Sequence, residues 1–112
     1  MTTRQTEKPV IVSDFGDDPD MAELVSEFVS GLPQQIADLQ AAFTAGDTET
    51  VTRLAHSLAG AGGGYGFRPI TDQARIVEME QRDSASPESI RASIEALADI
   101  CDRARRGIES NA

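Results

Sequence analysis

The segment LAHSLAGAGGGYGF, from Leu54 to Phe67, contains His56, the only histidine of this 112-residue chain. Its apolar residues recur at spacings of three and four, which predicts an amphipathic helix. At about 100° per residue, one face carries an apolar stripe made of Val51, Leu54, Ala55, Leu58 and Gly62. His56 points roughly 130° away from the centre of that stripe. We therefore expect its imidazole to be exposed.

The neighbours of His56 on the outer side of this helix are mostly small. Positions three, four or seven residues away share its face, and they are Thr52, Arg53, Ala59, Gly60 and Gly63. Gly60 weakens a helix by about 1 kcal/mol relative to alanine, and close approach of another molecule or of a neighbouring helix explains it best. An exposed histidine alone would be an ordinary surface residue. The glycines indicate a nucleophile that a partner protein can reach.

Length and charge restrict the class of protein. The chain has the size of a single domain, and 10 Lys and Arg against 19 Asp and Glu give a net charge of −9. This balance argues against nucleic-acid binding and against an anionic membrane surface. The single cysteine, Cys101, cannot form an internal disulfide and occupies an apolar helical position, so we expect a buried thiol and a cytoplasmic protein.

The sequence before His56 predicts a long first helix. Asp18 and Pro19 form a cap and first-position pair, and apolar residues follow at helical spacing: Met21, Leu24, Val25, Phe28, Val29, Leu32, Ile36, Leu39 and Phe43. Gly31 and Pro33 interrupt the pattern, which predicts either one kinked helix or two helices nearly in line. Gly46 is the predicted end of this helix.

Three further helices complete the expected fold. Asp47 or Thr48 caps the helix that carries His56, which ends after about Gly62. Pro69 begins the next helix, whose inward positions are Ile70, Ala74 and Val77, with Ile76 beside them. Ser86 precedes the last helix, whose apolar positions are Ile90, Ile94, Leu97, Cys101, Ala104 and Ile108.

The predicted fold class is all-α. Short connections predict an antiparallel up-down four-helix bundle over residues 10–108, with a short N-terminal extension. Residues 1–9 are expected to be a disordered tail, residues 10–12 an apolar patch over one end of the bundle, and residues 109–112 a C-terminal tail.

Other chemistries fit the glycine-rich segment poorly. It lacks the lysine and following serine or threonine of a P-loop, and no strand precedes it. One histidine and one buried cysteine do not make a metal site. A self-contained hydrolase needs a second group to orient His56. No motif supplies one, which leaves a carboxylate distant in the sequence as the open alternative.

The segment from Ala55 to Gly66 resembles the signature of histidine-containing phosphotransfer (Hpt) domains, A-H-x-L-K-G-x-x-x-x-x-G. Ala55, His56, Leu58, Gly60 and Gly66 match at the right spacing, and the likeness extends from about Val10 to Ile108. The resemblance implies a relay rather than a turnover enzyme. His56 would exchange a phosphoryl group with the aspartate of receiver domains, in response regulators or hybrid histidine kinases. No cofactor is implied on this chain, because the divalent metal belongs to the receiver.

One position departs from the family pattern. Hpt domains usually carry a lysine three residues after the histidine, where this chain has Ala59. Arg53, on a similar face to His56, is the first candidate to replace that lysine, and Arg68 is the second. Gly60 and Gly63 would allow docking.

Two other readings stay open at this stage. One is an adaptor that docks receiver or kinase domains without carrying phosphate, and the other is a self-associating bundle, although we expect a monomer. Tyr65 and Phe67 either form an apolar docking edge or cap the end of the bundle.

Overall fold

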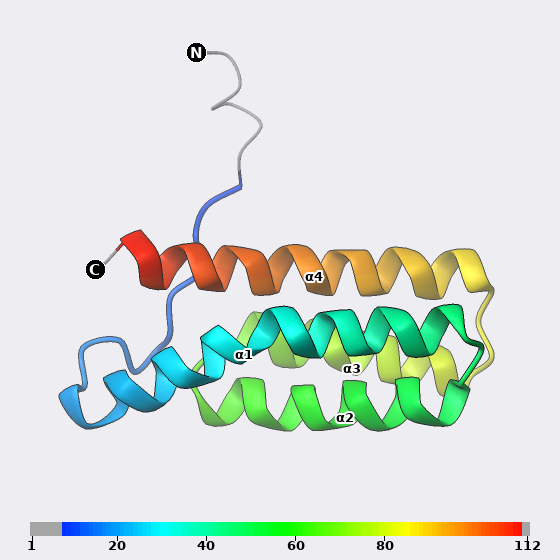
Figure 1. The fold of residues 1–112 in the computed structure, drawn as a ribbon, viewed down its shortest axis with the longest axis horizontal. Coiled ribbons are helices and arrows are strands. Elements are labelled where there is room, and N and C mark those ends of the chain that lie inside the picture. The colour runs from blue at the N-terminus through cyan, green and yellow to red at the C-terminus, as the bar shows by residue number, and fades with distance from the viewer. Residues whose placement is uncertain (1–7, 111–112) are drawn as a thin grey trace, which may run out of the picture.

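The computed structural model describes residues 8–110. Four helices follow one another: α1 (Pro19–Thr44), α2 (Thr48–Gly64), α3 (Arg68–Arg82) and α4 (Pro87–Ser110). α1 and α3 run in one direction and α2 and α4 in the other (Figure 1). Each helix contacts its two neighbours, so that the order α1, α2, α3, α4 closes into a ring. The predicted all-helical antiparallel bundle is confirmed.

Capping side chains begin three of the four helices. Asp18 and Asp47 accept backbone hydrogen bonds at the starts of α1 and α2, and Ser86 does the same for α4. Each satisfies a backbone N–H that has no partner inside the helix. These three predicted helix starts are confirmed. α3 begins at Arg68, one residue before Pro69, and no side chain caps it.

α1 is one continuous helix through Gly31 and Pro33, which decides between the two alternatives that the sequence left open. It ends at Thr44, and Gly46 follows with a φ of +74°. Glycine adopts this left-handed conformation without the steric cost of a Cβ, so the predicted stop near Gly46 is confirmed.

The core receives apolar side chains from every helix. Its largest fully buried members are Phe67, Leu32, Leu39, Leu58, Ile70, Leu97, Val29, Val51 and Val77. Cys101 is buried as predicted, and this burial raises the pKa of its thiol to about 12. Two apolar residues of the predicted helical patterns, Leu24 and Ile76, are exposed. Each directly precedes a buried valine, so one step around the helix takes the side chain off the inward stripe.

The N-terminal segment is attached to the bundle earlier than predicted. Residues 1–7 of the expected tail lie outside the described residues, but Lys8 forms an ion pair with Asp99, and the Arg103 guanidinium donates to the carbonyl of Pro9. Ile11 packs against the core. The tail predicted to end at residue 9 therefore already contacts α4 at residue 8. At the other end, α4 extends to Ser110, two residues beyond the predicted limit.

The same segment then crosses to the turn between α2 and α3. The Ser13 hydroxyl donates to the carbonyl of Tyr65 at 2.6 Å, and the Asp14 N–H donates to the carbonyl of Gly66 at 2.9 Å. Gly66 has a φ of +84°, and a Cβ there would collide with Ser13. This glycine therefore allows the N-terminal segment to fasten the end of the helix that carries His56.

A polar contact joins α3 to α4 and predicts a pH effect. Glu80 accepts hydrogen bonds from the hydroxyls of Ser93 and Ser89, and these bonds lower the pKa of its carboxyl. A depressed folded-state pKa contributes stability above the unfolded value, near 4.5, that is lost as the pH falls through the folded value. Glu80→Gln should therefore reduce the free energy of unfolding at pH 7, and the difference should shrink below pH 4. Urea unfolding across this range measures it, and a difference that does not change with pH would contradict the assignment.

No helix is long and apolar enough to cross a membrane, as far as the described residues extend.

Candidate functional site

His56 lies on the outer face of α2, and 74% of its side chain is exposed. The opposite face of α2 buries Val51, Ala55 and Leu58 against the core. The exposure predicted from helical periodicity is therefore correct.

A carboxylate on the next helix holds the imidazole. Nδ1 of His56 lies 2.9 Å from Oε2 of Glu78, whose side chain is only 11% exposed. A carboxylate oxygen only accepts hydrogen bonds, so Nδ1 carries the proton and donates it. In the neutral imidazole the lone pair is then on Nε2, the ring nitrogen that Glu78 does not hold. This tautomer is the one that a nucleophilic Nε2 requires.

Glu78 was missed in the sequence because it is 22 residues away from His56. The available signal was weak: an acidic residue one turn after Ala74 and next to Val77, at the edge of the inward stripe of α3. Close packing of α2 on α3 brings the two side chains together. Gly62 makes this possible, because a Cβ there would lie 3.0 Å from Ile70.

Two arginines lie beside the imidazole. Arg82 contacts the same Oε2 of Glu78 at 2.8 Å, so that one carboxylate oxygen binds both the guanidinium and the imidazole. Arg53 and Arg82 also line an open groove with His56, together with Thr48, Glu49, Thr52 and Gln81. The structure thus brings the predicted Arg53 to the site and adds Arg82. Arg68 instead lines a separate hollow with Gly63.

Ala59 corrects the prediction for the outer face. It is only 5% exposed, and its carbonyl accepts a hydrogen bond from the Thr71 hydroxyl at 2.6 Å. α3 packs over this flank of α2, which a single-helix projection does not include. The side chain of Ala59 therefore does not face a partner.

The glycines after His56 have different surroundings. Gly60 is exposed, and a Cβ added there would meet no atom within 4 Å. Of the two explanations that the sequence suggested, close packing of a neighbouring helix therefore does not apply to Gly60 within the described residues. Gly63 is also exposed, although a Cβ there would lie 3.3 Å from the Thr71 hydroxyl. The close helix packing that was considered for Gly60 is found at Gly62.

The two aromatic residues after the glycines cap the bundle. Phe67 is fully buried, and Tyr65 stacks on Phe28 with ring centroids 4.6 Å apart. Of the two roles that the sequence left open, the structure supports the cap.

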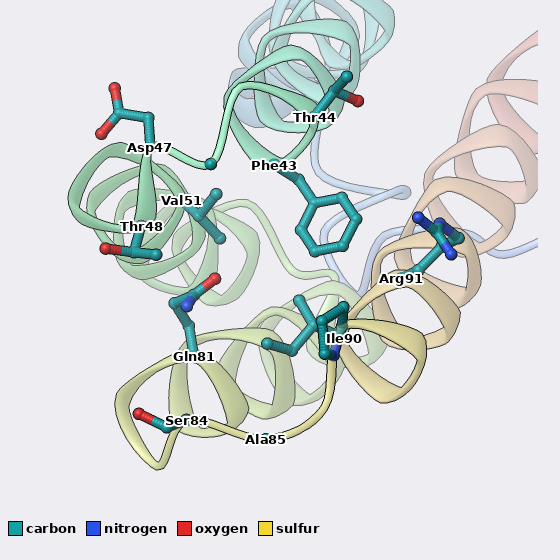
Figure 2. Close-up of a pocket in the computed structure, with 12 residues that line it drawn as sticks. Phe43, Thr44, Asp47, Thr48, Val51, Gln81, Ser84, Ala85, Ile90 and Arg91 are labelled. Atoms are coloured by element: carbon teal, nitrogen blue, oxygen red, sulfur yellow. The ribbon is translucent and has the colours of Figure 1, made fainter.

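A second hollow, of about 460 Å³, lies at the end of the bundle where α1 and α3 end (Figure 2). Phe43 forms one wall, with the guanidinium of Arg91 5.5 Å from its ring centroid, and Val51 and Ile90 lie deeper. Thr48 and Gln81 line both this hollow and the groove at His56. His56 is not among its lining residues, so the hollow is a neighbour of the site and not part of it.

Comparison with known families decides the assignment. The sequence pattern of the Hpt domain matches residues 23–107, which include α2, α3 and most of α1 and α4. The chain belongs to the Hpt domain family. No curated protein and no solved structure matched it. An Hpt domain implies a role in phosphotransfer within two-component or phosphorelay signalling, and Hpt domains typically exchange phosphoryl groups with receiver domains. The matched region of this Hpt domain contains His56, Glu78 and Arg82.

Proposed function

We propose that this Hpt domain is a phosphorelay intermediate. It accepts a phosphoryl group on Nε2 of His56 and donates it again, in exchange with the aspartate of receiver domains in response regulators or hybrid histidine kinases. The observation that carries the proposal is the exposed imidazole whose Nδ1 is held by Glu78 at 2.9 Å.

The proposed step balances without a further reactant. The Nε2 lone pair attacks phosphorus in line, the N–P bond forms, and the P–O bond to the receiver aspartate breaks. The carboxylate leaves with the electron pair, and Nδ1 keeps its proton. Because the ring becomes positively charged as Nε2 bonds to phosphorus, the negative charge of Glu78 at Nδ1 stabilises the product side. The divalent metal that neutralises the phosphoryl oxygens is expected on the receiver.

Glu78→Gln tests this electrostatic role. Glutamine retains an acceptor for Nδ1 but removes the charge, and the loss of a charge-assisted hydrogen bond should slow transfer about tenfold. The rate is measured in single turnover with a phosphorylated receiver. The control is Glu80→Gln, a change of the same kind on the same helix that contacts α4 instead of His56. Equal rates in Glu78→Gln and the wild type would contradict the role.

Arg53 is the proposed replacement for the usual lysine, because it lines the groove at His56 and Ala59 faces inward. Arg53→Ala should shorten the lifetime of phosphohistidine by about two- to fivefold, the range of an exposed charge pair. Lifetime is followed by loss of label after the receiver is removed. An unchanged lifetime and transfer rate would show that Arg53 does not take over this role. Gly60 and Gly63 are proposed to let the receiver approach.

A labelled transfer assay tests the function. The protein is incubated with a panel of receiver domains that carry radiolabelled aspartyl phosphate. The proposal predicts label on this chain that is labile in acid and stable in base. Receivers that bind without transferring label would support the alternative, an adaptor that works without phosphorylation. The argument for this alternative is that Ala59 stands where Hpt domains usually have a lysine.

A further inference from the structure

The charge of this chain limits how a partner can approach His56. The net charge is −9, and a receiver that delivers an aspartyl phosphate presents further negative charge. Like charges repel over the whole surface, so approach is favoured where positive charge collects. Four of the ten basic residues are arginines on α2 or α3. Arg53 lies on α2 and lines the groove at His56, and Arg68, Arg75 and Arg82 lie on α3.

Three of these arginines form a row. Arg68, Arg75 and Arg82 are spaced by seven residues, which places them on nearly the same face of α3, and all three are exposed. Arg82 contacts Glu78, the residue that holds His56. The row therefore begins at the imidazole and extends along the helix toward Gly63, where Arg68 and Arg75 line one hollow.

An apolar side chain lies within this row. Met79 is 55% exposed, four residues after Arg75 and three before Arg82, so that it lies next to both on the helix surface. Ile76, 38% exposed, lies one turn before it on the side toward α4. A flexible thioether suits contact with a partner surface. The exposed residues that follow His56 on the outer side of α2 are small: Ser57, Gly60 and Gly64.

Acidic side chains lie between and beside these arginines: Asp72, four residues after Arg68 and three before Arg75, adjoins both on the helix surface. Asp72 and Asp83 lie on the outer side of α3, and Asp14 and Asp72 share the hollow of Arg68 and Arg75. Glu49 lines the groove at His56. Basic and acidic side chains thus alternate along this edge, with Arg82 already paired to Glu78, and such a pattern fixes the orientation of a charged partner.

We propose that the α3 edge, formed by Arg75, Met79 and Arg82, is the docking surface for the acidic side of a receiver domain. This inference rests on the proposed function, because it names the surface that the phosphoryl donor or acceptor binds. An apolar contact at Met79 and a charge pair with Arg75, beside the Arg82–Glu78 pair, would hold the receiver aspartate over Nε2 of His56.

Titration of a receiver domain that binds the wild-type protein tests the α3 edge. Binding is measured without phosphorylation, at 50 and 300 mM salt, for Arg75→Glu and Met79→Ser. Each change should raise Kd about tenfold at low salt, the effect of losing one central contact, and Arg75→Glu should weaken the salt dependence. The matched controls are Arg91→Glu on α4 and Leu24→Ser on α1, also an exposed arginine and an exposed apolar residue. Their Kd should change less than twofold.

Two outcomes would overturn the docking surface. One is an unchanged Kd in both α3 variants. The other is a raised Kd in Leu24→Ser together with an unchanged Kd in Met79→Ser, which would place the receiver over α1. Failure of the proposed function gives a different result, namely receiver binding that depends on Arg75 and Met79 but no label on the chain. Circular dichroism of each variant confirms that the helices are retained.

Discussion

His56→Gln is expected to abolish phosphoryl uptake while leaving the fold and receiver binding unchanged. The side chain is 74% exposed and packs little against the core, so the substitution removes few contacts. A glutamine amide can still donate a hydrogen bond to Glu78, but its nitrogen lone pair is delocalised and cannot attack phosphorus. We expect at least a 100-fold loss of label, with the midpoint of urea unfolding unchanged.

The neighbouring hydroxyl provides the control for this experiment. Ser57 is exposed and directly follows His56, so it is the nearest alternative acceptor along the chain. Ser57→Ala should accept label at the wild-type rate. Label that persists in His56→Gln and disappears in Ser57→Ala would show that the phosphoryl group is on Ser57 and not on His56, which would contradict the proposal.

Gly60→Leu is expected to block transfer and to stabilise the protein. A Cβ at this position meets nothing within 4 Å, so no internal clash occurs. Leucine favours the helix over glycine by about 0.5–1 kcal/mol. Helical side chains lean toward the N-terminus, so the leucine would extend over the face of His56, one turn earlier. Bulk at that place should exclude the receiver and lower the transfer rate about 100-fold.

Gly60→Ala separates bulk from helix stability. Alanine gives a similar gain in helix stability but adds only one methyl group, so transfer should stay within about threefold of the wild type. Equal losses in the two variants would indicate that chain flexibility at Gly60 matters, and normal transfer in Gly60→Leu would refute the argument from close approach.

Features that depend on one helix at a time could be predicted from the sequence. The caps at Asp18, Asp47 and Ser86 and the exposure of His56 follow from local chemistry and periodicity, and the structure confirms them. The resemblance to Hpt domains rested on the segment from Ala55 to Gly66, and the family match over residues 23–107 confirms it.

Features that depend on how helices pack could not be predicted in the same way. Ala59 is on the outer face of α2 in isolation, but α3 covers it. The hydrogen bond between His56 and Glu78 requires the particular rotation of α3 against α2 that Gly62 permits. One sequence contains no direct information on that rotation.

The contacts of the N-terminal segment with α4 could not be predicted for a related reason. The polar residues up to Pro9 were expected to form a tail, yet Lys8 and Pro9 already contact α4, and a Cβ at Gly107 would collide with the carbonyl of Ile11. A glycine near the end of a helix with a regular apolar pattern was the signal for this close backbone contact, and only the folded arrangement reveals its partner.

The position of the phosphoryl group on the imidazole is the most direct test of the central claim. Nitrogen-15 and phosphorus NMR of the histidine-labelled protein, after transfer from a phosphorylated receiver, identifies the substituted ring atom. The account predicts phosphorus on Nε2 of His56, with the proton retained on Nδ1 beside Glu78. Phosphorus on Nδ1, or on a residue other than His56, would contradict it.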